Sequence, residues 1–148
     1  MQAVLAALGI LGTLGGVVLG GRLEHRRWLR DKRLQAYSAM NTAIGVWLKA
    51  YTHLERHDGG LAELTDAIGD LADKQQAVRL LGSATTRKRA HDTLAVAVAG
   101  YIQATAAARE ERELTDEETD AVIEELGNEG QRLFEAQMAD LHRRPDRP

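Results

Sequence analysis

Two histidines with acidic neighbours form a cluster whose spacing suits a metal ion. His53 and His57 lie four residues apart, and Glu55 and Asp58 stand beside them. Side chains four apart share a helix face, so the pair could hold a divalent metal. The order His-Leu-Glu-Arg-His differs, however, from the His-Glu-x-x-His pattern of zinc proteases, and the Glu-x-x-His pairs of metal-binding bundles are missing. We therefore interpret both histidines as exposed residues near a helix C-terminus, where positive charge is favourable, and predict no metal site.

The sequence contains no motif that indicates a hydrolase or a nucleotide-binding protein. Its two serines, Ser38 and Ser83, stand outside Gly-x-Ser-x-Gly, and neither a P-loop nor a Gly-x-Gly-x-x-Gly loop occurs. The chain has no cysteine, which excludes disulfides, thiolate catalysis and cysteine-ligated zinc. The sequence therefore predicts a non-enzyme without catalytic or cofactor-binding residues.

Charge is divided unevenly along the 148 residues, whose net charge is −3. Residues 1–33 carry +4 and the remainder −7. Residues 110–125 hold nine acidic side chains against Arg112, which favours a solvated helix start and leaves docking of a basic partner as the alternative. The basic cluster Arg87-Lys88-Arg89 could face those acids, lipid headgroups or nucleic acid. Because aromatic residues do not interleave with it, we expect no nucleic-acid binding.

The strongest pattern is an apolar run near the N-terminus. Residues 3–21 carry no charge, and Thr13 is their only polar side chain. About 20 apolar helical residues cross a hydrocarbon core roughly 30 Å thick. A secretory signal peptide would place its basic residues before the run, whereas here the basic cluster follows Gly21. We therefore predict an uncleaved transmembrane helix over residues 1–21; a buried glycine-rich helix of a soluble protein is the alternative.

The basic cluster after this run predicts the orientation of the chain. Basic residues beside a span stay in the cytoplasm, so we expect an external N-terminus and a cytoplasmic body at the inner (plasma) membrane. Anionic headgroups would bind the juxtamembrane stalk, residues 22–36. Trp28, about 10 Å beyond Gly21 along a helix, suits an indole anchor at headgroup depth, although it could equally be a bundle residue. The predicted headgroup-binding residues are Arg22, Arg26, Arg27, Trp28, Arg30, Lys32 and Arg33.

Three glycines within the apolar run share a helix face. Gly12, Gly16 and Gly20 are spaced four apart and form two overlapping Gly-x-x-x-Gly patterns. Small residues on one face let two helices approach closely within lipid. The pattern favours self-association of the membrane helix into a homo-oligomer, or its packing against a different membrane protein.

The first half of the remaining chain has the pattern of two amphipathic helices. From Tyr37 to Leu54 the apolar residues recur at alternating steps of three and four, the heptad period of coiled coils and bundles. Asp58-Gly59-Gly60 is predicted to end the first helix. The next helix extends to about Leu81, where Gly82-Ser83 supplies a stop and the N-cap of the third.

The second half predicts two more helices. The third is expected over residues 84–112, with small apolar residues that imply close helix approach, and a capping box from Thr115 to Glu118 opens the fourth. Strand patterns are missing, and no breaker separates the apolar run from Tyr37. The predicted fold is therefore all-α: a single transmembrane helix continues into a cytoplasmic antiparallel four-helix bundle over residues 37–142, and a disordered tail follows at 143–148.

Two segments resemble small membrane-anchored helical proteins of actinobacteria and their phages. They are Trp-Leu-Arg-Asp-Lys-Arg-Leu-Gln-Ala-Tyr at 28–37, after the apolar run, and Val-Arg-Leu-Leu-Gly-Ser at 78–83. Those uncharacterised proteins have no assigned activity, so the resemblance implies a lineage and leaves the function open.

These features predict a non-enzymatic single-pass membrane protein whose cytoplasmic bundle is an interaction or scaffolding module for a protein partner. One alternative is a sensory or regulatory bundle that binds a ligand between its helices, with Asn41, Gln75 and Gln137 near the apolar stripes as its candidate polar groups. A phage-type protein that forms membrane lesions is a further alternative, supported by the glycine face.

Overall fold

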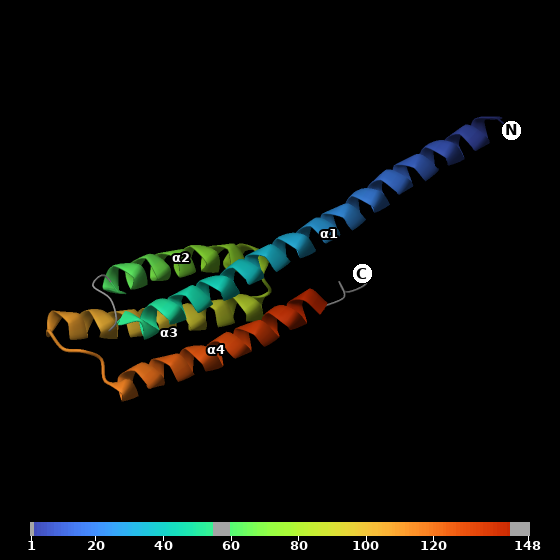
Figure 1. Cartoon of the computed structure of the whole chain (residues 1–148). Helices are drawn as coiled ribbons and strands as arrows, with labels where there is room; N and C mark the ends of the chain where they lie inside the picture. Colours follow the sequence, from blue (N-terminus) through green and yellow to red (C-terminus); the bar gives the residue numbers. More distant parts are fainter. Residues whose placement is uncertain (1, 55–59, 143–148) are drawn as a thin grey trace. The chain divides into compact units, whose positions relative to one another are not determined.

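The computed structural model describes residues 2–54 and 60–142, with side chains from Glu24 onward. These residues form four helices: α1 (Gln2–Thr52), α2 (Gly60–Leu81), α3 (Ala84–Arg109) and α4 (Asp116–His142), shown in Figure 1. No strand occurs in the described ranges, so the predicted all-α class is confirmed.

The chain divides into two compact units, residues 1–32 and residues 33–148. The second unit contains the end of α1 together with α2, α3 and α4, which lie side by side with alternating direction (Figure 1). We call residues 33–142 the bundle. It begins four residues before Tyr37, where the heptad pattern starts.

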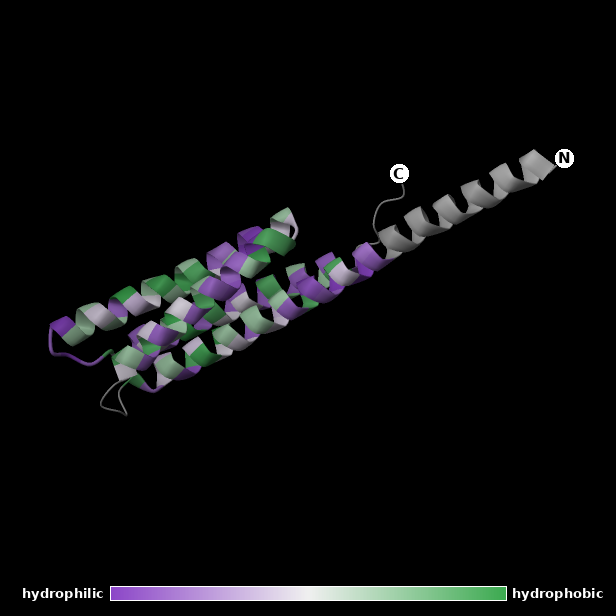
Figure 2. Ribbon diagram, turned by 90° about the horizontal axis from the view of Figure 1, so that it is seen from above, coloured by the Kyte–Doolittle hydropathy of each residue, from purple (hydrophilic) through white to green (hydrophobic). Residues whose placement is uncertain are grey.

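The predicted apolar stripes form most of the bundle core, but Phe134 and Met138 of the α4 stripe are exposed. In Figure 2, hydrophobic and hydrophilic residues alternate along its helices, as expected for helices with one buried face. Large side chains from three of the helices fill the core, and α3 contributes mostly small ones. The largest fully buried apolar residues are Met40, Trp47 and Tyr51 of α1, Leu64, Leu71 and Val78 of α2, and Leu126 and Leu133 of α4.

Close packing of α3 is clearest at Gly100. A Cβ atom at this position would lie 2.7 Å from Val122 Cγ1 and 3.0 Å from Trp47 Cη2. The indole therefore occupies the space that a larger residue would need. This confirms the prediction that small residues on this helix serve close approach between helices.

Two helix ends differ from the sequence prediction. Helix α1 ends at Thr52, six residues before Asp58. Helix α3 ends at Arg109 instead of residue 112, because Glu111 adopts a left-handed backbone (φ 54°). The Arg112 N–H then donates to the Ala107 carbonyl oxygen at 3.1 Å and the Glu111 N–H to that of Ala108 at 3.3 Å. This is a Schellman motif with glutamate in the place that glycine usually takes.

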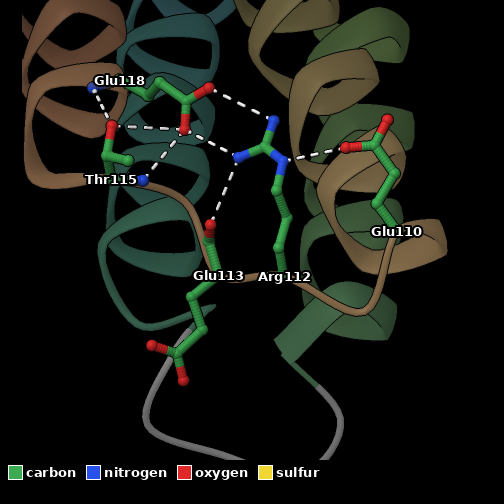
Figure 3. A network of polar contacts seen from close by, with 5 residues as sticks. All are labelled: Glu110, Arg112, Glu113, Thr115 and Glu118. Atoms are coloured by element: carbon green, nitrogen blue, oxygen red, sulfur yellow. Dashed lines mark hydrogen bonds and ion pairs between the residues drawn. The ribbon is translucent and has the colours of Figure 1, made fainter.

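Both predicted helix caps are confirmed. The Ser83 hydroxyl accepts a hydrogen bond from the Thr86 N–H at the start of α3. At α4 the Glu118 N–H donates to Thr115 Oγ1 at 3.2 Å, and the Thr115 N–H donates to Glu118 Oε2 at 2.9 Å (Figure 3). These reciprocal bonds are a capping box.

Arg112 reinforces the capping box from the loop between α3 and α4. Figure 3 shows its guanidinium between Glu110 and Glu118; Nη1 lies 3.0 Å from Glu118 Oε2, and Nε lies 2.9 Å from Glu110 Oε2. The backbone hydrogen bond from Thr115, followed by the bond from Arg112, lowers the pKa of Glu118 to about 2. Part of the acidic stretch is thus used to begin a helix.

Among the residues whose side chains the structure describes, 24–54 and 60–142, no helical segment has the length and apolarity that a membrane crossing requires. The predicted span at residues 3–21, including Gly12, Gly16 and Gly20, lies outside the residues whose side chains are described. The predicted tail at 143–148 also lies outside the described residues. Both stay predictions.

Candidate functional site

A groove between α1 and α4 is the candidate site of the bundle. This open groove has a volume of about 410 Å³, within the range of roughly 300–1,000 Å³ that is usual for ligand sites. Its α1 wall is largely polar, whereas its α4 wall is largely apolar. The lining residues are Leu34, Tyr37, Ser38, Asn41 and Thr42 of α1, and Phe134, Gln137, Met138 and Leu141 of α4.

Large apolar side chains of the groove are exposed. Leu34 is 55% exposed, Phe134 49% and Met138 39%. Phe134 is the only phenylalanine of the chain, yet it lies outside the core, whose α3 side is filled by small residues. Phe134, Met138 and Leu141 follow the i, i+4, i+7 spacing of one helix face. Adjoining exposed apolar side chains of this kind mark interaction sites more often than isolated ones do.

Two amide side chains pair within the groove. Asn41 Nδ2 donates to Gln137 Oε1 at 2.9 Å, and Gln137 Nε2 donates to Asn41 Oδ1 at 3.2 Å. Gln137 is buried and Asn41 is half-buried. Each amide therefore donates one hydrogen bond to the other and accepts one from it. The pair also fixes the register of α1 on α4.

The structure thus brings together two of the three polar residues that the sequence suggested for ligand binding. Gln75 is buried on α2 and does not line the groove. The ligand-binding alternative therefore depends on Asn41 and Gln137.

A buried carboxylate lies beside the groove. Asp140 Oδ2 accepts hydrogen bonds from the Tyr37 hydroxyl and, at 2.9 Å, from the Ser83 N–H. Arg33 Nη1 lies 3.7 Å from Asp140 Oδ1, and Arg33 Nε donates to the Leu81 carbonyl oxygen at 2.7 Å. Burial, together with the bond to Asp140, raises the pKa of Tyr37. This Asp140 cluster joins α1 and α4 to the turn between α2 and α3.

Asp140 was not among the residues that the sequence suggested. A usable signal exists, because Leu126, Leu133 and Asp140 recur every seven residues along the buried side of α4. An acidic residue in such a series requires buried partners. Those partners, Tyr37 and the Ser83 N–H, are distant in sequence and only the fold reveals them.

The predicted headgroup-binding residues are in different situations. Arg26, Arg27 and Arg30 are exposed, as is Trp28, whose ring stacks on His25 with centroids 5.9 Å apart. Lys32 is also exposed, and Arg22 lies outside the residues with described side chains. Arg33 instead binds Asp140 and Leu81 inside the bundle. Headgroup binding by this set stays a prediction.

His53 and the basic cluster that the sequence suggested as binding residues do not line the groove. No group of three or more His, Cys, Asp or Glu side chains that could hold a metal occurs among the described residues; His53 is half-buried, and His57 lies outside them. Two residues of the cluster at 87–89 form ion pairs within the bundle: Lys88 pairs with Asp92 at 2.8 Å, and Arg89 Nη1 lies 3.6 Å from Glu129 Oε2 of α4.

Comparison with models of known protein families finds no match, and comparisons with characterised proteins and with solved structures find none either. The resemblance to actinobacterial and phage proteins therefore stays a prediction, and the functional argument depends on the groove and the sequence.

Proposed function

We propose that this protein is a non-enzymatic, single-pass membrane protein whose cytoplasmic bundle binds a helix of another polypeptide in the α1–α4 groove. The observation that carries the proposal is the half-exposed trio Leu34, Phe134 and Met138. Grooves between helices commonly receive an amphipathic helix whose apolar residues occupy the exposed apolar sites. The spacing of Phe134, Met138 and Leu141 on α4 suits such a ligand.

The chemistry of the groove supports recognition rather than catalysis. Its polar lining consists of two paired amides, two aliphatic hydroxyls and the Tyr37 phenol, which already donates to Asp140. Tyr37 has a raised pKa, which disfavours its use as a proton donor or acceptor near neutral pH. The groove therefore offers shape and hydrogen bonds but no evident nucleophile.

Membrane anchoring is supported by the sequence. Residues 3–21 are long and apolar enough for one span, and the exposed Arg26, Arg27 and Arg30 follow it. Basic residues on that side favour a cytoplasmic bundle and contact with anionic headgroups, at about 1 kcal/mol per residue near the surface. Anchoring would hold the groove close to partners in the same membrane.

A second candidate is binding of a small, largely apolar ligand. The volume of about 410 Å³ and the polar side chains of Asn41 and Gln137 in its lining favour it. A photoreactive benzoyl-phenylalanine at position 134 separates the two functions in native membranes. The matched control is the same group at Ile102, which is 60% exposed on α3.

We expect irradiation to give a protein adduct at position 134 and none at position 102. A mass increase without a protein adduct would instead support the small ligand. Absence of any adduct at position 134, or equal adducts at both positions, would contradict a binding function of the groove.

A further inference from the structure

We infer that the α1–α4 groove is occupied by a second copy of this chain, in a parallel two-fold dimer in which α1 of each copy packs over α4 of the other. The inference rests on the proposed function, because it names the partner of the groove. It is carried by the complementary size and charge of the two groove walls.

The walls differ in the size of their side chains. On α1, Leu34 is large and exposed where the groove begins, but the following turns present Ser38 and Thr42 to the groove, and Gly45 follows with open space where a Cβ atom would stand. Thr42 Oγ1 donates to the Ser38 carbonyl oxygen at 3.0 Å, so the hydroxyl is satisfied within α1 and the methyl group can make apolar contacts. On α4 the lining residues Phe134 and Met138 are large. Packed helices interdigitate large side chains with small ones, so the α4 wall of one copy fits the α1 wall of another.

The direction of the two-fold axis decides which walls meet. An axis parallel to the helices places α1 over α4 twice, so both sets of large residues face short ones. An axis perpendicular to the helices places α1 over α1 and α4 over α4. Phe134 and Met138 would then face their own copies, and the short residues would leave space unfilled.

The charges of α1 and α4 also favour the two-fold axis that runs parallel to the helices. Apart from the Arg33–Asp140 pair inside each copy, α4 carries eight acidic residues against Arg132, whereas the bundle part of α1, residues 33–52, carries Lys49 and no acid. Packing α4 over α4 would bring like charges together, and packing α1 over α4 brings opposite charges together. Lys49 lies eleven residues, about three turns, after Ser38 and therefore shares its face of α1.

The parallel dimer also suits two anchored chains. It leaves Arg33 of both copies at the same end, so both chains can enter one membrane. The perpendicular axis would place these residues at opposite ends of the dimer.

Cysteine cross-linking in membranes tests this inference, because the chain has no native cysteine. Two full-length chains with different tags are co-expressed, one with Thr42→Cys and the other with Phe134→Cys. The register set by Asn41 and Gln137 brings these positions to nearly the same height in the parallel dimer. Ser38→Cys with Met138→Cys is a second pair, and Thr42→Cys with Ile102→Cys is the matched control.

We expect both groove pairs to form disulfides that carry both tags on mild oxidation, with loss of this product in the control. Disulfides of Phe134→Cys with its own copy, without the Thr42 product, would overturn the parallel arrangement. Failure of both pairs while their cysteines still react with maleimide would refute the second copy as occupant. If benzoyl-phenylalanine at position 134 then captures a different protein, the proposed function stands and this inference fails.

Discussion

The buried carboxylate of Asp140 provides the sharpest test of how the bundle is held together. Asp140→Ala leaves the Tyr37 hydroxyl and the Ser83 N–H without their acceptor, both next to the core. It also removes the ion pair of Arg33. All three groups come from parts of the chain far from α4 in sequence, so the change should weaken the whole bundle rather than one helix end.

The expected loss is about 3 kcal/mol. Two hydrogen bonds to a charged acceptor contribute roughly 1.5–3 kcal/mol each. The Arg33 side chain is about one-third exposed, so its ion pair adds little. Asp140→Ala also removes the free-energy cost of burying a carboxylate, and this offsets part of the stability lost with the two hydrogen bonds. For a domain of this size, about 3 kcal/mol corresponds to a fall in Tm of roughly 10 °C.

Urea unfolding of the full chain in detergent, followed by far-ultraviolet circular dichroism, measures this loss. Tyr37→Phe removes one donor and should lose about 1 kcal/mol, less than Asp140→Ala. The control is Asp66→Ala on the exposed side of α2, which should change the free energy of unfolding by less than about 0.5 kcal/mol. An Asp140→Ala protein as stable as the control would refute the role assigned to this carboxylate.

Three further predictions concern the core, the α3 cap and alkaline pH. Gly100→Ala should lower the free energy of unfolding by about 1–3 kcal/mol because its Cβ would meet Trp47 and Val122. Gly127→Ala, with open space around it, should raise the free energy of unfolding by up to about 1 kcal/mol. If urea unfolding showed that both variants change the free energy of unfolding in the same direction, the packing described for Gly100 would be contradicted. Glu111→Gly should raise Tm by a few degrees because it relieves the left-handed backbone, and an unchanged or lower Tm would argue against that strain. Burial, and then the charge of Glu118, raises the pKa of Tyr51 to about 12. The contribution of Tyr51 to stability should therefore be full below pH 10 and fall between pH 10 and 12, because only the unfolded phenol ionises in that range. Tyr51→Phe should make this fall less steep, and an equally steep fall in that variant would exclude Tyr51 as its source.

Local patterns predicted most of the fold. The heptad spacing from Tyr37 identified the buried face of α1, and the Ser83 and Thr115 caps marked the starts of α3 and α4. These features depend on residues close in sequence, so periodicity and capping rules suffice. The end of α3 was missed because Glu111 takes a backbone conformation that its residue type disfavours.

The candidate site could be predicted only in part. Asn41 and Gln137 were noticed as polar residues near the stripes, but their pairing joins residues 96 positions apart. The exposure of Phe134 could not be predicted because this residue lies on the same apolar stripe of the helix as the buried residues around it. Which apolar residues on a broad stripe face the core depends on how α1 and α4 meet, and the sequence of one helix does not determine this.

The central claim is that the bundle is anchored to the cytoplasmic side of a membrane. Leu80 is 84% exposed on α2, so Leu80→Cys gives a single reactive thiol that should not disturb the core. The measurement is labelling of this cysteine by a membrane-impermeant maleimide in washed inside-out vesicles and in right-side-out spheroplasts. We predict labelling in the inside-out vesicles and none in intact spheroplasts. Labelling in the spheroplasts, or absence of the protein from washed vesicles, would contradict the account.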